Sequence, residues 1–197
     1  MTRVFWVRHG ENVANLSRTF SHRVFDGDLT EQGRDQALAL ARSLADSGVR
    51  FTEMWASPLR RSRQTAEILG HHLDLGLAGD LDELREVDVG ELDGRNDASA
   101  WATCGEVLAD WRQGNLDRRF PGGENGHELA TRISSALHRL ASASAGPILV
   151  VAHGANIRAA IPPLTGTPDP GADMGTATAA QIEVHPASIH LELWPAG

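Results

Sequence analysis

The stretch that decides the fold is VFWVRHGE at residues 4–11. Its four apolar residues have the length of a buried strand, and a charged turn of Arg8, His9 and Gly10 ends them. This pattern predicts a strand that delivers a histidine to the edge of a sheet, where open α/β sheets bind ligands. The glycine has no Cβ, so a backbone amide can approach a ligand closely there.

The same arrangement recurs far along the chain, where the apolar run ILVVA at residues 148–152 leads into His153 and Gly154. An asparagine follows each histidine at the same spacing, Asn12 in the first unit and Asn156 in the second. We therefore expect two strands that present two histidines at one edge of the sheet.

Helices and strands alternate around these two units. The expected helices cover about 30–47, 57–72, 98–113, 129–140 and 155–161, and the further strands cover 51–56, 177–184 and 189–194. Ser57 and Pro58 are expected to be the N-cap and first residue of the second helix, and residues 162–163, both proline, to stop the last. The alternation predicts an α/β fold with a mostly parallel sheet. The stretch over about 95–130 is expected to form a small helical cap beside it.

Composition restricts the function. The chain has 197 residues with 41% apolar content, which predicts one domain over 1–197. Its net charge is −8 and it has no long Lys/Arg tract, so we expect no nucleic-acid or membrane partner. The single cysteine, Cys104, allows no intramolecular disulfide and no cysteine metal cluster. The first residues lack a signal-peptide pattern and no apolar run has bilayer length, so we expect a cytoplasmic protein.

Three arginines crowd the expected start of the second helix: Arg60, Arg61 and Arg63. Cations are unfavourable near the positive end of a helix dipole, by a few tenths to about 1 kcal/mol each. A bound anion there would reverse the sign of that interaction. An overall acidic protein needs such local arginines if it is to bind an anion.

Five residues form a constellation that suits phosphoryl transfer: Arg8, His9, Arg61, Glu86 and His153. Planar guanidinium groups match the oxygens of a phosphoryl group. A neutral imidazole can attack phosphorus, and a protonated carboxyl group can supply a proton to the leaving oxygen. A second histidine, if cationic, stabilises the equatorial oxygens. The acidic stretch around Glu86 offers three other carboxylates, at Asp82, Glu83 and Asp88.

Five segments, in order along most of the chain, resemble the motifs of the histidine phosphatase superfamily, the phosphoglycerate mutase-like phosphatases. They are RHGE at 8–11 with Asn15, SPLRR at 57–61 with Thr65 and Ala66, LRE at 84–86 with Gly90 and Gly94, FPGGE at 120–124, and HG at 153–154. The resemblance implies a three-layer fold, a mainly parallel central sheet flanked by helices.

By that resemblance, His9 is the nucleophile and Glu86 the proton donor. The residues implied to bind the phosphate are Arg8, Asn15, Ser21, Arg61, His153 and Gly154. The chain departs from the family at Asn12, where Thr, Ser or Gln is usual. Its loop over 16–28, with His22 and Arg23, is slightly longer than usual and its role stays open.

We therefore expect a metal-independent phosphatase that needs no cofactor, forms a phosphohistidine and acts on a small phosphorylated metabolite. A phosphomutase is the alternative within the same chemistry. The resemblance implies that mutases of this family tend to be longer and carry an arginine pair before a proline-rich stretch. Here Arg118 and Arg119 lead into FPGG instead, which favours hydrolysis. A non-catalytic phospholigand-binding protein and a metallohydrolase using His9 and His153 are the alternatives from other classes. The substrate and the oligomeric state, including a homodimer, stay open. Specificity is expected from the 16–28 loop, the 95–130 cap and the 162–175 loop.

Overall fold

The computed structural model describes residues 1–169, 171 and 174–195, and its core is a six-stranded sheet. The strands are β1 (Thr2–Arg8), β2 (Glu53–Ala56), β3 (Leu77–Asp80), β4 (Ile148–Ala152), β5 (Ala179–His185) and β6 (Ser188–Leu193). The helices are α1 (Val13–Ser17), α2 (Glu31–Asp46), α3 (Arg60–Leu73), α4 (Ala98–Arg112), α5 (Gly126–Ala143) and α6 (Gly154–Thr165), with 3₁₀ turns η1 (Asp82–Leu84) and η2 (Gly90–Leu92). Positions 170, 172 and 173 of the expected 162–175 loop lie outside the described residues.

The strand order is β3-β2-β4-β1-β5-β6. The pairs β3–β2, β2–β4 and β4–β1 are parallel, whereas β5 pairs with β1, and β6 with β5, in antiparallel fashion. The expected mostly parallel α/β sheet is therefore confirmed. None of the helices in the described chain is long and apolar enough to cross a membrane.

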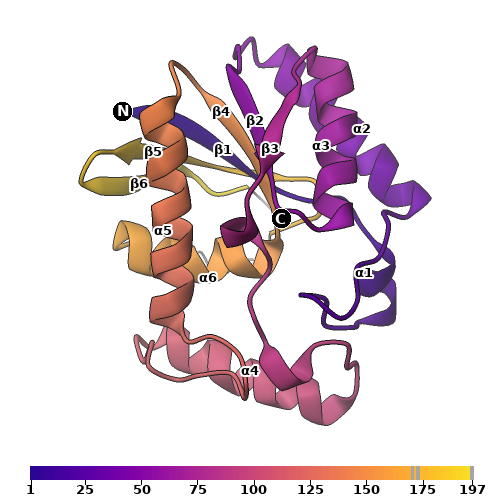
Figure 1. The fold of residues 1–197 in the computed structure, drawn as a ribbon, viewed down its shortest axis with the longest axis vertical. Helices are drawn as coiled ribbons and strands as arrows, with labels where there is room; N and C mark the ends of the chain where they lie inside the picture. Colours follow the sequence, from indigo (N-terminus) through magenta and orange to yellow (C-terminus); the bar gives the residue numbers. More distant parts are fainter. Residues whose placement is uncertain (170, 172–173, 196–197) are drawn as a thin grey trace.

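Side chains of β1 alternate between two cores, as the period of a strand requires. Val4 and Trp6 pack into the core that includes side chains of α5 and α6, and Phe5 and Val7 pack into the core shared with α2 and α3. Figure 1 shows the resulting three layers, with α5 and α3 on opposite faces of the strands.

The central pairing of β1 with β4 brings the two histidine units together. Arg8 is in register with Ala152, so His9 and His153 follow adjacent strand ends at the same edge of the sheet. Beyond the sheet lies α4, near the lower end of α5 in Figure 1, within the stretch expected to form a cap. Ala100 and Val107 of α4 are fully buried in the core that also holds α5 and α6.

The expected start of the second helix was wrong. Helix α3 begins at Arg60, with Leu59 as an N-cap residue that makes no side-chain hydrogen bond. The Ser57 amide donates to the Val151 carbonyl at 2.8 Å, which continues the pairing of β2 with β4 past the end of the strand. Ser57 still follows the sheet, and its hydroxyl accepts from the Leu59 amide at 3.4 Å and lies 2.8 Å from His153 Nε2, so it does not cap α3.

The expected stop at the two prolines was also wrong, because Pro162 and Pro163 lie inside α6. Proline fixes φ near −65°, which suits a helix, and its cost is the missing amide hydrogen bond. The helix ends at Gly166, whose φ of 70° is the left-handed value that favours glycine. The sequence pattern also missed two short elements, α1 and β3.

Candidate functional site

A cleft of about 370 Å³ lies at the edge of the sheet where β1 and β4 end. It gathers most of the residues expected from the sequence. Those lining it are Arg8, His9, Asn15, Ser21, Arg61, Glu86 and Gly154. His153 is completely buried and does not line the cleft.

Both ring nitrogens of His9 make hydrogen bonds, one with the backbone and one with Arg61. Its Nδ1 lies 2.7 Å from the Gly10 carbonyl oxygen, which can only accept, so Nδ1 carries the proton. Its Nε2 accepts from Arg61 Nε at 3.0 Å and therefore bears the lone pair. Burial, and then the charge of Arg61, hold the His9 pKa well below 6.5. His9 is thus a neutral, oriented base.

The Arg61 guanidinium is 2% exposed and is fixed by the 16–28 loop. It donates to the Ser21 hydroxyl at 2.9 Å and to the Ser21 carbonyl at 2.8 Å, and Asp26 lies 3.8 Å away. Burial lowers the Arg61 pKa to about 10, although Glu86 and Asp26 oppose that shift. The side chain remains a cation at neutral pH. Ser21 also donates to the Phe25 carbonyl, so its hydroxyl proton is engaged within the loop.

His153 stands beside His9, with ring centroids 5.2 Å apart. Its Nε2 is 2.8 Å from the Ser57 hydroxyl, and its Nδ1 is buried with no hydrogen-bond partner among the described residues. Burial, followed by the charges of Arg61 and His9, holds its pKa well below 6.5. The cationic form considered from the sequence is therefore disfavoured in the protein without a ligand.

The carboxylate of Glu86 is anchored by two backbone amides. Its Oε1 accepts from the Val87 amide at 2.9 Å and from the Asn156 amide at 2.8 Å, within the first turn of α6. The positive end of that helix dipole favours an acidic group there. Both hydrogen bonds fall on Oε1, which leaves Oε2 for a ligand.

The three other carboxylates considered beside Glu86 do not line the cleft. Asp82 pairs with Arg85, and Glu83 pairs with Arg139 at 2.9 Å. Asp88 accepts from the Gly90 amide at 3.0 Å. Among the acidic residues of this stretch, the structure therefore brings only Glu86 to the cleft.

Arg8 and Gly154 lie against each other. A Cβ added to Gly154 would sit 2.8 Å from Arg8 Cδ and 2.9 Å from its Nε, so only glycine fits without moving the arginine. Arg8 also donates to the Met174 carbonyl. The second histidine unit thus contributes the space that the Arg8 side chain occupies.

Asn12 and Asn15 form the capping box of α1. The Asn12 amide donates to Asn15 Oδ1 at 3.0 Å, and the Asn15 amide donates to Asn12 Oδ1 at 3.1 Å. Both side chains line the cleft, and Asn12 Nδ2 is buried with no acceptor among the described residues. The box orients both amide groups, so the residue that departs from the family pattern is itself part of the site.

Sequence reasoning missed Arg132, a residue of α5. Its guanidinium donates to the carbonyl oxygens of Glu83, Arg85 and Glu86, at 2.6, 2.9 and 3.1 Å. Glu124 pairs with it at 2.7 Å and accepts from the Asp88 amide at 2.9 Å. Arg132 thereby fixes the backbone that carries Glu86. No sequence signal pointed to it, whereas Glu124 stands in the quoted FPGGE segment.

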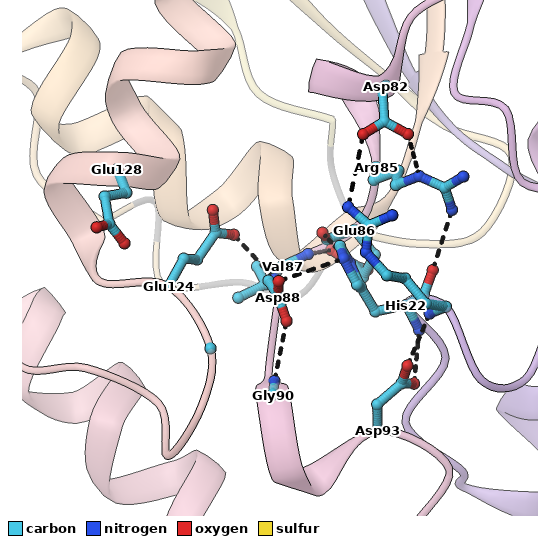
Figure 2. A network of polar contacts seen from close by, with 12 residues as sticks. His22, Asp82, Arg85, Glu86, Val87, Asp88, Gly90, Asp93, Glu124 and Glu128 are labelled. Atoms are coloured by element: carbon cyan, nitrogen blue, oxygen red, sulfur yellow. Dashed lines mark hydrogen bonds and ion pairs between the residues drawn. The ribbon is translucent and has the colours of Figure 1, made fainter.

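His22, whose role the sequence left open, ties the 16–28 loop to the same backbone. Its Nδ1 lies 2.8 Å from the Glu86 carbonyl oxygen, and its amide donates to Asp93 at 2.8 Å. Figure 2 shows His22 within this network, with Asp93 on one side and Arg85 on the other. The 16–28 loop, which contacts Arg61, is therefore connected to the backbone segment that contains Glu86. Within the described residues, His, Cys, Asp and Glu side chains form no group of three or more that could hold a metal ion.

Three comparisons relate this chain to known proteins. Residues 4–196 match the family model described as histidine phosphatase superfamily (branch 1). A relative named "Probable phosphoglycerate mutase GpmB" from Escherichia coli is 32% identical over 173 residues, covering 85% of this chain and 77% of the relative.

Solved structures give the same picture. The mycobacterial glucosyl-3-phosphoglycerate phosphatase in complex with VO3 matches over 100% of both chains, with a TM-score of 0.83 and 28% identity. A phosphoglycerate mutase from Bacillus anthracis matches with a TM-score of 0.80 over 97% of this chain and 91% of its own, and at 20% identity it bears on the fold alone.

Proposed function

The chain belongs to the histidine phosphatase superfamily, and from that premise we propose that it hydrolyses a small phosphomonoester through a phosphohistidine on His9. Membership and the names of its relatives support a phosphatase or a phosphomutase activity. Hydrolysis rather than transfer to a second hydroxyl, the phosphohistidine intermediate and the roles of the individual residues are what we propose in addition.

One observation carries the proposal: the arrangement of the two nitrogens of His9. The Gly10 carbonyl holds the proton on Nδ1, and Arg61 donates to Nε2 at 3.0 Å inside the cleft. A neutral imidazole with its lone pair beside a cation has the protonation state and the surroundings that attack on a phosphoryl group needs. When a phosphate binds, its oxygens replace Nε2 as the acceptor for Arg61.

The proposed reaction has two steps. His9 Nε2 forms a bond to phosphorus while the ester P–O bond breaks, and Glu86 in its carboxylic acid form gives its proton to the leaving oxygen. The Glu86 carboxylate then takes a proton from water as the water oxygen attacks phosphorus and the P–N bond breaks. His9 and the protonated Glu86 are restored, and inorganic phosphate leaves.

The remaining site residues would bind the phosphoryl oxygens. Arg8 and Arg61 supply planar donors that match phosphate geometry. Asn15 Nδ2 lies opposite the oxygen used in the capping box and is available to donate. The Gly154 amide, at the positive end of the α6 dipole, would add another donor. Binding of a dianion beside His153 would favour the cationic form of that ring.

A phosphomutase is the second candidate, because the curated relative reported above carries a mutase name. In a mutase, the phosphoryl group on His9 passes to a second hydroxyl of the substrate instead of to water. We favour hydrolysis because Arg118 and Arg119, at the place where mutases of this family carry an arginine pair, form ion pairs at the protein surface. Arg119 pairs with Glu128 at 2.6 Å, and Arg118 lies 3.7 Å from Asp110.

The test is phosphate release from a panel of phosphomonoesters with chelator present, comparing wild type with His9→Ala. The proposal predicts chelator-resistant release that is lost in the variant. A parallel assay for exchange between 2- and 3-phosphoglycerate separates the two candidates. Isomerisation faster than phosphate release would refute the hydrolytic assignment, and release that persists in His9→Ala would refute the phosphohistidine route.

A further inference from the structure

The cleft has two ends of different chemistry. The end at the sheet edge carries the arginines, His9 and Glu86 described above. The rest, which we call the outer compartment, extends between α4, α6 and the segment around Val87. Its walls are mainly apolar and include Val87, Val89, Leu108, Trp111, Pro162 and Met174. At about 370 Å³, the whole cleft falls within the range of small-molecule sites, about 300–1,000 Å³.

The polar atoms of its aromatic walls are used inside the protein. Trp111 donates through Nε1 to the Arg118 carbonyl at 2.7 Å, and Trp101 donates to the Arg18 carbonyl at 3.0 Å. Each indole is therefore positioned by its nitrogen, and its carbon surface is what remains for contact in the cleft. Pro162 and Pro163 in α6 have no amide hydrogen to offer.

Three charged residues line the outer compartment, and they pair with one another. Asp169 accepts from Arg112 Nε at 2.9 Å and from Arg158 Nε at 3.2 Å. Its side chain is 17% exposed, and its carboxylate neutralises one of the two positive charges. A ligand carboxylate that approached these arginines would lie close to the Asp169 carboxylate, which would repel it.

We infer that the outer compartment binds an uncharged apolar group, aryl or branched alkyl, as the organic part of the phosphomonoester. The inference rests on the proposed function and names the substrate class for it. Phosphomonoesters whose organic part carries a carboxylate, such as phosphoglycerates, would then be poor ligands. Burial of apolar surface against Leu108 and Trp111 would supply the discrimination.

Calorimetric binding of non-hydrolysable phosphonates tests this without turnover. Pentylphosphonate and 4-phosphonobutyrate are similar in length and differ in the carboxylate, and methylphosphonate reports the phosphate end alone. We expect benzylphosphonate and pentylphosphonate to bind at least about tenfold more tightly than methylphosphonate and 4-phosphonobutyrate. Equal or tighter binding of 4-phosphonobutyrate would overturn the inference.

A pair of variants on α4 locates the effect. Leu108→Asn keeps side-chain size but places an amide in the compartment, and Ala102→Gln changes an exposed residue of the same helix that does not line the cleft. Leu108→Asn should weaken benzylphosphonate about tenfold and leave methylphosphonate unchanged, while Ala102→Gln changes neither. A parallel loss for both ligands in Leu108→Asn would contradict the inference.

The two proposals can fail separately. If no ester is hydrolysed in a His9-dependent manner and the apolar phosphonates still bind more tightly, the phosphatase assignment fails and the ligand class stands. If hydrolysis depends on His9 and the carboxylate-bearing ligands are preferred, the phosphatase assignment stands and the ligand class fails.

Discussion

The two strand-histidine-glycine units look alike in sequence and serve different purposes in the structure. The first places His9 in the cleft, where Nε2 accepts from Arg61 and Nδ1 donates its proton to the Gly10 carbonyl. The second places His153 behind it, where Nε2 meets the Ser57 hydroxyl and the ring does not line the cleft. The same local pattern therefore gives one ring that lines the cleft and one that lies buried behind it.

The difference comes from what surrounds each ring, because the strands are in register and the rings are 5.2 Å apart. Ser57 extends the pairing of β2 with β4 and so brings its hydroxyl to His153. Arg61, one turn further on, extends to His9 and Ser21 instead. The segment from Ser57 to the first turn of α3 thus gives the two histidines their different polar partners.

The largest effect should follow removal of the attacking group. His9→Gln keeps a polar side chain and loses the nucleophile, so kcat should fall by about 10⁴-fold or more. Steady-state phosphate release on the best substrate of the panel measures this. A fall in kcat no larger than that of His153→Gln would show that the two histidine units are equivalent in catalysis.

His153→Gln should reduce kcat by about 10²–10³-fold, the range for losing one group that stabilises charge in the transition state, because this ring lies beside His9 and would become cationic when the phosphoryl group binds. The phosphoenzyme should still form, only more slowly, because His9 and Arg61 remain. Rapid-quench measurement of its formation tests this. Complete loss of the intermediate in a folded His153→Gln protein would assign the nucleophile to the second unit.

Arg61→Lys should cost about 10²-fold in kcat/KM, because lysine offers one charge where the guanidinium donates to both His9 and Ser21. Arg60→Ala is the matched control, since Arg60 is exposed and pairs with Asp28 at 2.8 Å. Its kcat/KM should stay within about twofold of wild type. Equal losses of kcat/KM in the two variants would show that Arg61 has no special role in catalysis.

The smallest effect concerns stability, and here the two histidines should behave alike. Both have a pKa well below 6.5 in the folded protein, so below that pH the unfolded chain binds more protons than the native one. Stability should therefore fall as pH drops through 6.5, by up to about 1.4 kcal/mol per pH unit for each histidine.

Denaturant unfolding at neutral and mildly acidic pH measures this slope. Each of His9→Gln and His153→Gln should flatten it by a similar amount, with the double variant flattening it most. A slope unchanged in both variants would mean that neither ring stays neutral in the folded protein.

The sequence predicted the sheet and the two histidine positions because these depend on local patterns. The family resemblance indicated Glu86, which the structure places in the cleft. Apolar runs of strand length mark β1 and β4, and the glycines after them mark backbone that lies against other groups. The parts it missed depend on contacts across the chain. Ser57 was expected as a cap because Ser-Pro favours that position, but pairing with Val151 keeps it in the sheet.

Arg132 shows the same limit within the site. It lies on α5, far along the chain from Glu86, and reaches that backbone only because α5 packs across the sheet face. The different partners of His9 and His153 could not be predicted from the sequence either, since they depend on which side chain each ring meets in the folded protein. A pattern of residues can therefore indicate a type of chemistry. The different contacts that similar residues make can be seen only in the folded structure.

We propose that His9 alone carries the phosphoryl group, and mapping the phosphate in the trapped phosphoenzyme tests this directly. Wild-type protein quenched during turnover, kept out of acid and digested should yield a phosphopeptide containing His9, with acid-labile phosphate. His153→Gln should give the same peptide, and His9→Gln should give none. Phosphate on the peptide containing His153, or turnover in His9→Gln with no trapped intermediate, would show that His9 is not the nucleophile.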